Sequence, residues 1–209
     1  MKITKQQLAI GVLILFCTVT FLVRIYLTKS MFFGFLLWNI FLATIPFIVS
    51  ECIKRKKNQK IMTIFLFFIW LLFLPNAPYL ITDFIHLHHL KSTLIWYDLF
   101  MLFCFAFTGV LLGIISAYDV YNIIKLHFQQ SIANKIIIFV FFLSGLGIYL
   151  GRFLRLNSWD LFTKPLNVLH QILASFSHNK AWLVTFGFGS LFWVLFFVYK
   201  SLLINEEKK

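Results

Sequence analysis

Six long apolar runs alternate with short polar segments along the chain. Each run has about the 20 residues that an α-helix needs to cross the hydrocarbon of a bilayer. A crossing segment must satisfy its own backbone hydrogen bonds, and these runs lack the alternation of barrel strands, so each run predicts a helix. We expect an all-α integral membrane protein, a six-transmembrane-helix bundle in which residues 1–209 form a single transmembrane domain. The expected spans are about 8–28, 31–50, 61–80, 95–117, 133–152 and 182–203.

The third run ends in an unusually polar stretch, LPNAPYLITDFIHLHH, at residues 74–89. Pro75 and Pro78 remove backbone donors and clash with the preceding turn, which predicts a break or kink in the helix at this point. Asn76 and Tyr79 would then satisfy the freed backbone groups or face a cavity.

Two short helices are expected in addition to the six spans. Thr82 or Asp83 is a suitable N-cap for the first, and Asp83 and His86 share one of its faces because they are three residues apart. The second belongs to the last long loop, where apolar residues recur on one side as in a helix that lies in the membrane interface. Its apolar stripe consists of Leu166, Leu169, Ile172, Leu173 and Phe176.

Composition agrees with a membrane protein. The chain is 61% hydrophobic and 12% charged, whereas a soluble domain carries about 25% charged residues. A net charge of +12 would suggest nucleic-acid binding in a soluble protein. In a membrane protein the positive-inside rule explains the charge, so the lipid bilayer is the expected partner and no nucleic acid is expected.

The distribution of Lys and Arg predicts the orientation in the membrane. The segment ECIKRKKNQK, residues 51–60, is strongly basic and is therefore expected in the cytoplasm. Six spans then place both the N- and C-termini in the cytoplasm as well. The loops at 81–94 and 153–181 fall outside, so the expected interfacial helix lies in the last outer loop.

Polar residues gather where three of the spans reach the outer side. Asp98 lies about one turn inside an apolar run, where an ionised carboxylate is costly and usually has a partner. Arg152 and Arg155 are three residues apart, which would put them on one helical face. Asn157 followed by Asp160 resembles a capping box. The candidate ligand-binding residues are Asn76, Tyr79, Asp83, His86, Tyr97, Asp98, Arg152, Arg155, Asn157 and Asp160.

The polar residues at the outer span ends also allow an interpretation in which no ligand binds. Span ends collect polar and aromatic residues regardless of function, and an Asp–Arg pair would lock the fourth and fifth spans together. The glycine pairs of GVLLG (109–113) and GIYLG (147–151) predict close packing between the same two spans. Arg24, near the outer end of the first span, is expected to extend to the lipid headgroups.

Three blocks of this sequence resemble a known family: LPNAPYLITDFIHL, WYDL and LGRFLRLNSWDLFTKP. They are similar to the signature blocks of a bacterial multi-pass membrane family, domain of unknown function thirteen sixty-one, over roughly residues 65–165. The resemblance implies a protein of the bacterial plasma (inner) membrane. It implies no activity, no cofactor and no catalytic residue.

The first functional hypothesis is an outward-facing site that binds or transports a small anion or a phosphorylated lipid headgroup. Arg152 and Arg155 would hold phosphate or carboxylate, because the guanidinium fork matches these groups. Asp83, Asp98 and Asp160 would orient the arginines or accept protons. A broken helix fits this hypothesis, since transporters unwind helices where substrate binds.

Two alternatives remain, and whether the protein is an enzyme is undecided. In one, His86 and Asp83 bind zinc or a similar divalent metal, which activates water against a lipid-linked substrate. No cofactor is expected otherwise, and no Walker, Rossmann or HExxH pattern is present. In the other, the protein is an accessory or scaffold subunit whose outer face contacts a membrane protein partner.

Overall fold

The structure is a computed structural model that describes residues 4–89 and 94–206, without the side chains of His89, Phe162 and residues 204–206. The described residues form helices and connections, with no strand among them. Six helical segments in this part of the chain are long and apolar enough to cross a membrane, which confirms the predicted membrane-spanning helical fold. They are α1 (Lys5–Thr28), α2 (Phe35–Lys56), the segment Lys60–His88, α5 (Ile95–His127), α6 (Gln130–Phe153) and α9 (Asn179–Glu206).

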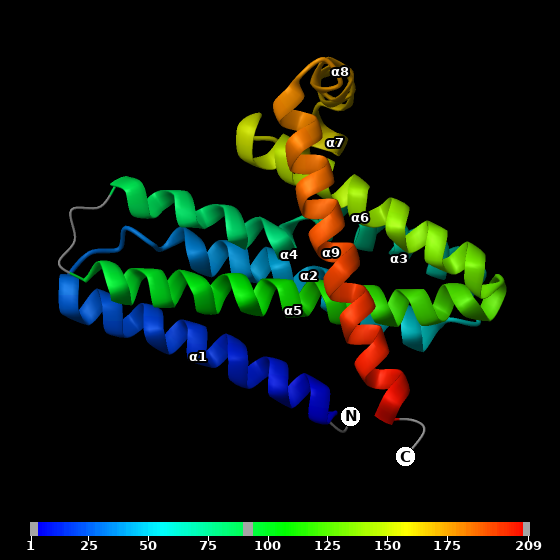
Figure 1. Cartoon of the computed structure of the whole chain (residues 1–209), viewed down its shortest axis with the longest axis horizontal. Coiled ribbons are helices and arrows are strands. Elements are labelled where there is room, and N and C mark those ends of the chain that lie inside the picture. The colour runs from blue at the N-terminus through cyan, green and yellow to red at the C-terminus, as the bar shows by residue number, and fades with distance from the viewer. Residues whose placement is uncertain (1–3, 90–93, 207–209) are drawn as a thin grey trace.

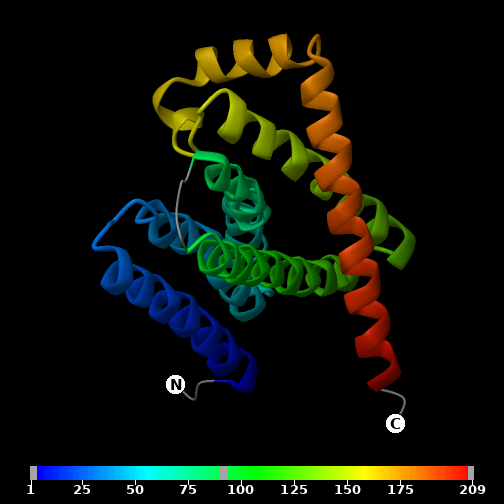
Figure 2. The same cartoon turned by 60° about the vertical axis from the view of Figure 1, so that its left-hand side comes forward.

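The six segments alternate in direction. In Figure 1, α1, α2 and α5 lie alongside one another, and α9 crosses in front of α5 after packing along α6. Figure 2 shows both termini at the lower end of the molecule and α8 (Pro165–Ser175) at the upper end. We refer to these as the terminal end and the α8 end. A hydrogen bond of 2.9 Å from Gln7 to Glu51 places the basic end of α2 at the terminal end.

The third span is broken as its prolines predict. It consists of α3 (Lys60–Phe73), the single turn α4 (Asn76–Tyr79) and the 3₁₀ helix η1 (Leu80–His89). The regular helix ends earlier than the predicted residue 80, because Pro75 and Pro78 have no N–H and interrupt the ladder of backbone bonds. The chain continues with tighter turns, in which the Ala77 N–H donates to the Leu74 carbonyl at 3.1 Å. Ten residues is a long run for a 3₁₀ helix.

Glycines hold α4 between two neighbouring helices. The glycines of GVLLG on α5 face Ala77, and those of GIYLG on α6 face Pro75 and Tyr79. A Cβ on the first glycine of each motif would lie 2.5 Å from the Ala77 carbonyl oxygen and 2.6 Å from the Pro75 ring, respectively. The prediction that these glycines face each other across the fourth and fifth spans was therefore wrong. They allow α5 and α6 to approach the broken helix instead.

The last connection contains the predicted short helix. It runs through α7 (Asp160–Thr163) and α8. Leu166, Leu169 and Leu173 are exposed, as expected for a helix whose apolar stripe contacts lipid. Val168 and Ile172 face the other way, toward the bundle, so Ile172 belongs to the bundle side and not to the predicted stripe.

Candidate functional site

Asp83 and Arg152 form the centre of a polar cluster at the α8 end. Asp83 is fully buried, and its carboxylate accepts a hydrogen bond from Asn39 on α2 (2.8 Å) and pairs with Arg152 on α6 (3.3 Å). Arg152 also donates to the Thr82 carbonyl at 2.8 Å and to the Tyr79 hydroxyl at 3.4 Å. One guanidinium therefore joins α6 to α4 and η1, and the carboxylate extends this connection to α2.

The 3₁₀ geometry of η1 brings His86 to the same cluster. A 3₁₀ helix has three residues per turn, so Asp83 and His86 lie directly above one another. Nε2 of His86 is 3.3 Å from Nη2 of Arg152, and the imidazole ring lies 4.6 Å from the Phe35 ring, centroid to centroid. Because guanidinium has no acceptor, this contact is a hydrogen bond when Nε2 of His86 carries no proton.

A large cavity adjoins this cluster. Its volume is about 1250 Å³. It is bordered by α3 and α4, by α2 and α6 on either side, and by the 155–161 segment and α8. The polar lining lies at the α8 end: Asn39, Asn76, Tyr79, His86, Arg152, Arg155, Asn157 and Ser158. Toward the terminal end the lining is apolar: Leu42, Phe65, Phe68, Ile69, Leu71, Leu72, Leu143 and Leu146.

Arg155 lies on this cavity in a different way from Arg152. The prediction that the two share a helical face was wrong, because α6 ends at Phe153 and Arg155 adopts a left-handed backbone with φ of 56°. The turn is closed by the Leu156 N–H, which donates to the Leu150 carbonyl at 3.1 Å. The Arg155 side chain is exposed and lines the cavity. Among the described residues no carboxylate pairs with it.

The segment after Arg155 is tied down by side chains. Asp160 accepts a hydrogen bond from the Asn157 backbone N–H at 2.7 Å, which is the acidic half of the predicted capping box. Asp160 therefore fixes the backbone that carries Asn157, and it is not among the residues that line the cavity. Ser158 accepts from Asn76 at 3.3 Å and donates to the Leu72 carbonyl at 3.2 Å. These contacts anchor the segment to the break between α3 and α4.

Asp98 and Tyr97 lie in a second, separate polar contact. Asp98 pairs with Arg24 of α1 at 3.1 Å, and both side chains are almost completely buried. Arg24 also donates to the Ser30 carbonyl at 3.1 Å, and the Tyr97 hydroxyl donates to the Thr20 carbonyl at 2.8 Å. Arg24 therefore does not extend to the headgroups as predicted. Asp98 locks the fourth span to the first, rather than to the fifth.

Asp83 and His86 were also the candidate metal ligands. Both oxygens of Asp83 already have partners, and Nε2 of His86 contacts a guanidinium. Within residues 4–89 and 94–206, no group of three or more His, Cys, Asp or Glu side chains is placed to hold a metal ion. Metal binding at His86 and Asp83 stays a hypothesis.

Three residues that take part in these polar contacts were not predicted from the sequence. Asn39 and Ser158 complete the polar cluster and the anchored segment, and Arg24 is the partner of Asp98. Asn39 had a detectable signal, since it is a lone amide inside the apolar run FLLWNIFLA, and polar residues inside spans usually face the interior of a bundle. Ser158 had no comparable signal.

Comparison with known proteins identifies the family. The family model described as "Protein of unknown function (DUF1361)" matches residues 38–195, so the chain belongs to this family. The matched range includes every residue that lines the cavity, whereas Arg24 lies outside it. Neither the curated proteins nor the solved structures include a match to this chain.

Proposed function

We propose that this member of the family binds an anionic amphiphile, taken from the surrounding bilayer, in the cavity beside Arg152. One observation carries the proposal: a single cavity of about 1250 Å³ joins a polar, arginine-bearing end to a long apolar trough. A lipid with a phosphate or carboxylate headgroup likewise has one polar, charged end and one apolar end. The headgroup would occupy the α8 end, and the alkyl chain would lie along α3 and α6.

The charge of the lining favours an anion. Its charged side chains are Arg152 and Arg155, and no Asp or Glu is among the described residues that line it. The two Nη nitrogens of Arg152 already contact Asp83, Tyr79, Thr82 and His86. Arg152 therefore supplies positive potential from a fixed position. Arg155 has no carboxylate partner among the described residues, so it is the group that would contact the headgroup directly.

The length of the trough matches one leaflet. The helical rise of about 1.5 Å per residue puts about 16 Å between Phe65 and Asn76. The hydrocarbon core of a bilayer is about 30 Å thick, so one leaflet contributes about half of that. An alkyl chain beside α3 therefore places its headgroup at the level of Asn76, Tyr79 and Arg155.

The size of the cavity favours a lipid over a small anion. Sites for drug-sized ligands have volumes of about 300–1,000 Å³, and an inorganic anion would fill only a small part of the 1250 Å³ available. The apolar trough would then have no occupant of matching chemistry. The lipid headgroup hypothesis thus accounts for both ends of the cavity.

We also propose an orientation. The basic residues Lys54, Arg55 and Lys56 end α2 at the terminal end, which by the positive-inside rule faces the cytoplasm. Both termini would then be cytoplasmic, and the cavity would take its lipid from the outer leaflet of a bacterial plasma membrane. The charge distribution supports this orientation, and the family resemblance supports the bacterial plasma membrane.

Reconstitution tests the binding proposal. The purified protein is placed in phosphatidylcholine nanodiscs that contain a minor fraction of phosphatidylglycerol, and the lipids that remain bound after extraction are counted by native mass spectrometry. Wild type is expected to retain phosphatidylglycerol selectively, and Arg155→Gln to lose most of this selectivity. Lys180→Gln is the matched control, because it removes an exposed cation from the start of α9 that does not line the cavity. Equal retention by all three proteins would overturn the proposal.

A further inference from the structure

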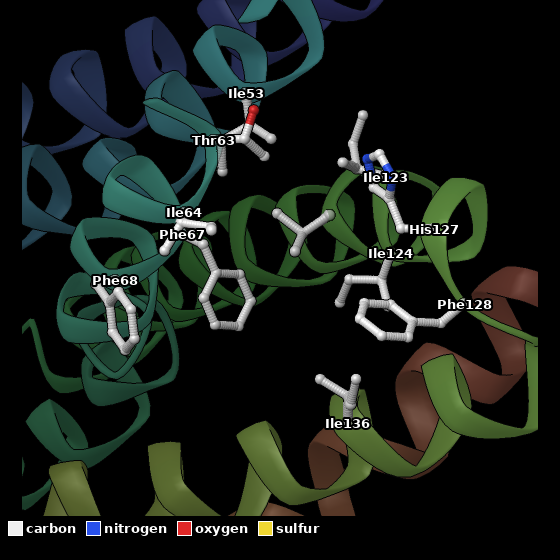
Figure 3. A pocket seen from close by; sticks show the side chains of 11 residues that line it. Ile53, Thr63, Ile64, Phe67, Phe68, Ile123, Ile124, His127, Phe128 and Ile136 are labelled. Atoms are coloured by element: carbon white, nitrogen blue, oxygen red, sulfur yellow. The ribbon is translucent and has the colours of Figure 1, made fainter. Parts of the chain in front are cut away.

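A second cavity lies between the first one and the terminal end. Its volume is about 300 Å³. Figure 3 shows it lined by side chains from the end of α2, the start of α3, the last turns of α5 and the start of α6. The lining is apolar except for Thr63 and His127. The apolar residues are Ile53, Ile64, Phe67, Phe68, Val120, Ile123, Ile124, Phe128 and Ile136.

Phe68 separates the two cavities. It is the residue that lines both of them, since the neighbouring Phe65 and Ile69 border only the larger cavity and Ile64 and Phe67 border only the smaller. The ring of Phe68 thus stands between the trough of the larger cavity and the smaller cavity, about one turn before Phe65.

We infer that Phe68 limits the length of the alkyl chain that the site accepts. This inference rests on the proposed function, because it assigns the chain to the trough between α3 and α6. A chain that starts at the polar end meets Phe68 after most of the roughly 16 Å between Asn76 and Phe65. Removing the ring would join the trough to an apolar space of about 300 Å³, which has the chemistry to receive further methylenes.

The apolar lining of the second cavity suits an alkyl chain and not a charged headgroup. Thr63 and His127 are its polar lining residues, and no charged Lys, Arg, Asp or Glu side chain is among the described residues that line it. A desolvated phosphate would find no Lys or Arg among the described lining residues, whereas each buried methylene is stabilised. The opened site would therefore select for longer chains while the headgroup stays at Arg155.

A competition experiment tests this inference. An equimolar series of n-alkyl phosphates, from decyl to eicosyl, is added to the detergent-purified full-length protein, and the bound chain lengths are read by native mass spectrometry. The comparison is between wild type, Phe68→Ala and Phe197→Ala. Phe68 and Phe197 are similarly exposed, at 61% and 64%, but Phe197 on α9 lines neither cavity, so its variant makes the same truncation outside the proposed site.

In wild type, occupancy is expected to level off once the chain fills the trough. In Phe68→Ala the ratio of the longest to the shortest bound phosphates is expected to rise by about tenfold, because each added buried methylene contributes about fourfold in affinity before the competing pull of the micelle. Phe197→Ala is expected to keep the wild-type distribution. This readout is a gain of binding, which a damaged protein would not produce.

Equal distributions in Phe68→Ala and Phe197→Ala would overturn the chain-length role. The Arg155→Gln protein separates this failure from that of the proposed function. If alkyl phosphates bind wild type more than Arg155→Gln but the chain preference never changes, only the role of Phe68 is refuted. If wild type and Arg155→Gln bind all phosphates equally, the anionic amphiphile site itself is refuted.

Discussion

The guanidinium of Arg24 lies 3.1 Å from the carboxylate of Asp98, and the two side chains join α1 to α5 inside the bundle. Phe33 covers this pair, with its ring centroid 4.8 Å from the guanidinium carbon. Asp98 therefore lies in a contact separate from the Asp83–Arg152 cluster, and it does not line the cavity. The two Asp–Arg pairs join different helices.

Breaking the buried pair should destabilise the protein strongly. Arg24→Met leaves the Asp98 carboxylate without its partner in a buried position, which costs about 3–5 kcal/mol. The measurement is the free energy of unfolding in mixed micelles. The double variant Arg24→Met with Asp98→Leu removes both charges and should recover much of the loss. A double variant no more stable than Arg24→Met alone would contradict the assignment.

Adding a methyl group at Gly109 should also destabilise the protein. A methyl group there meets the Ala77 carbonyl oxygen at 2.5 Å, so Gly109→Ala is expected to cost about 1–3 kcal/mol through overpacking and displacement of α4. Gly11→Ala is the control, since nothing lies within 4 Å of its added methyl. That variant should be neutral or stabilised by up to about 1 kcal/mol, because Ala is the better helix former. Thermal unfolding in detergent distinguishes the two, and equal shifts would argue against the close approach of α5 and α4.

Because the backbone at Arg155 is left-handed, Arg155→Gly and Arg155→Ala should differ in stability although both remove the cation. Glycine adopts a φ of 56° without penalty, whereas a side chain with a Cβ costs about 1 kcal/mol in this region. Arg155→Gly should therefore be about 1 kcal/mol more stable than Arg155→Ala, with equally weak binding of anionic lipid. The check combines thermal unfolding with lipid retention in the same preparations. If the alanine variant is the more stable one, the turn at Arg155 is not as described.

Removing the negative charge of Asp83 should strengthen anion binding. In Asp83→Asn the Arg152 guanidinium loses its counter-ion at 3.3 Å, so the positive potential in the cavity rises. Phosphatidylglycerol retention is expected to increase about two- to fivefold, which is the effect of one charge pair near a protein surface. The variant is expected to be less stable than wild type. Retention is compared with wild type at equal folded concentration. A decrease would mean that Asp83 itself contacts the ligand.

The orientation can be tested with single cysteines. In a protein without Cys17, Cys52 and Cys104, Asn157→Cys is expected to react with a membrane-impermeant maleimide added to intact cells. Lys57→Cys should react only after the membrane is opened. The opposite pattern would place the cavity at the cytoplasmic side and assign its lipid to the inner leaflet.

Much of the architecture was predictable because its causes are local. Span length and hydropathy are properties of each segment, so the six long helices follow from the pattern of apolar residues alone. The break at Pro75 and Pro78 is equally local, since proline lacks the donor that a helix needs. The end of α6 at Phe153 lies one residue from the predicted 152, but the position of Arg155 off the helical face was missed, because Arg is not a residue that typically adopts a positive φ.

Side-chain partners were less predictable because they depend on which helices are neighbours. From the sequence, Asp98 could pair with Arg24 on the first span or with Arg152 on the fifth. The packing of α5 against α1 selects Arg24. The glycine pairs show the same dependence, since small residues permit close approach without specifying the partner, which here is α4.

Six helical membrane spans, a broken third span and polar side chains concentrated at one end could all be predicted from the sequence. These properties follow from hydropathy, proline chemistry and charge along the chain. The pairing of Asp83, and not Asp98, with Arg152 depends on how the helices pack, and so does the cavity that joins this cluster to an apolar trough bordered by Phe68. The reason is that pairing and cavity shape arise from contacts between residues far apart in sequence, which helix packing selects among several chemically suitable partners.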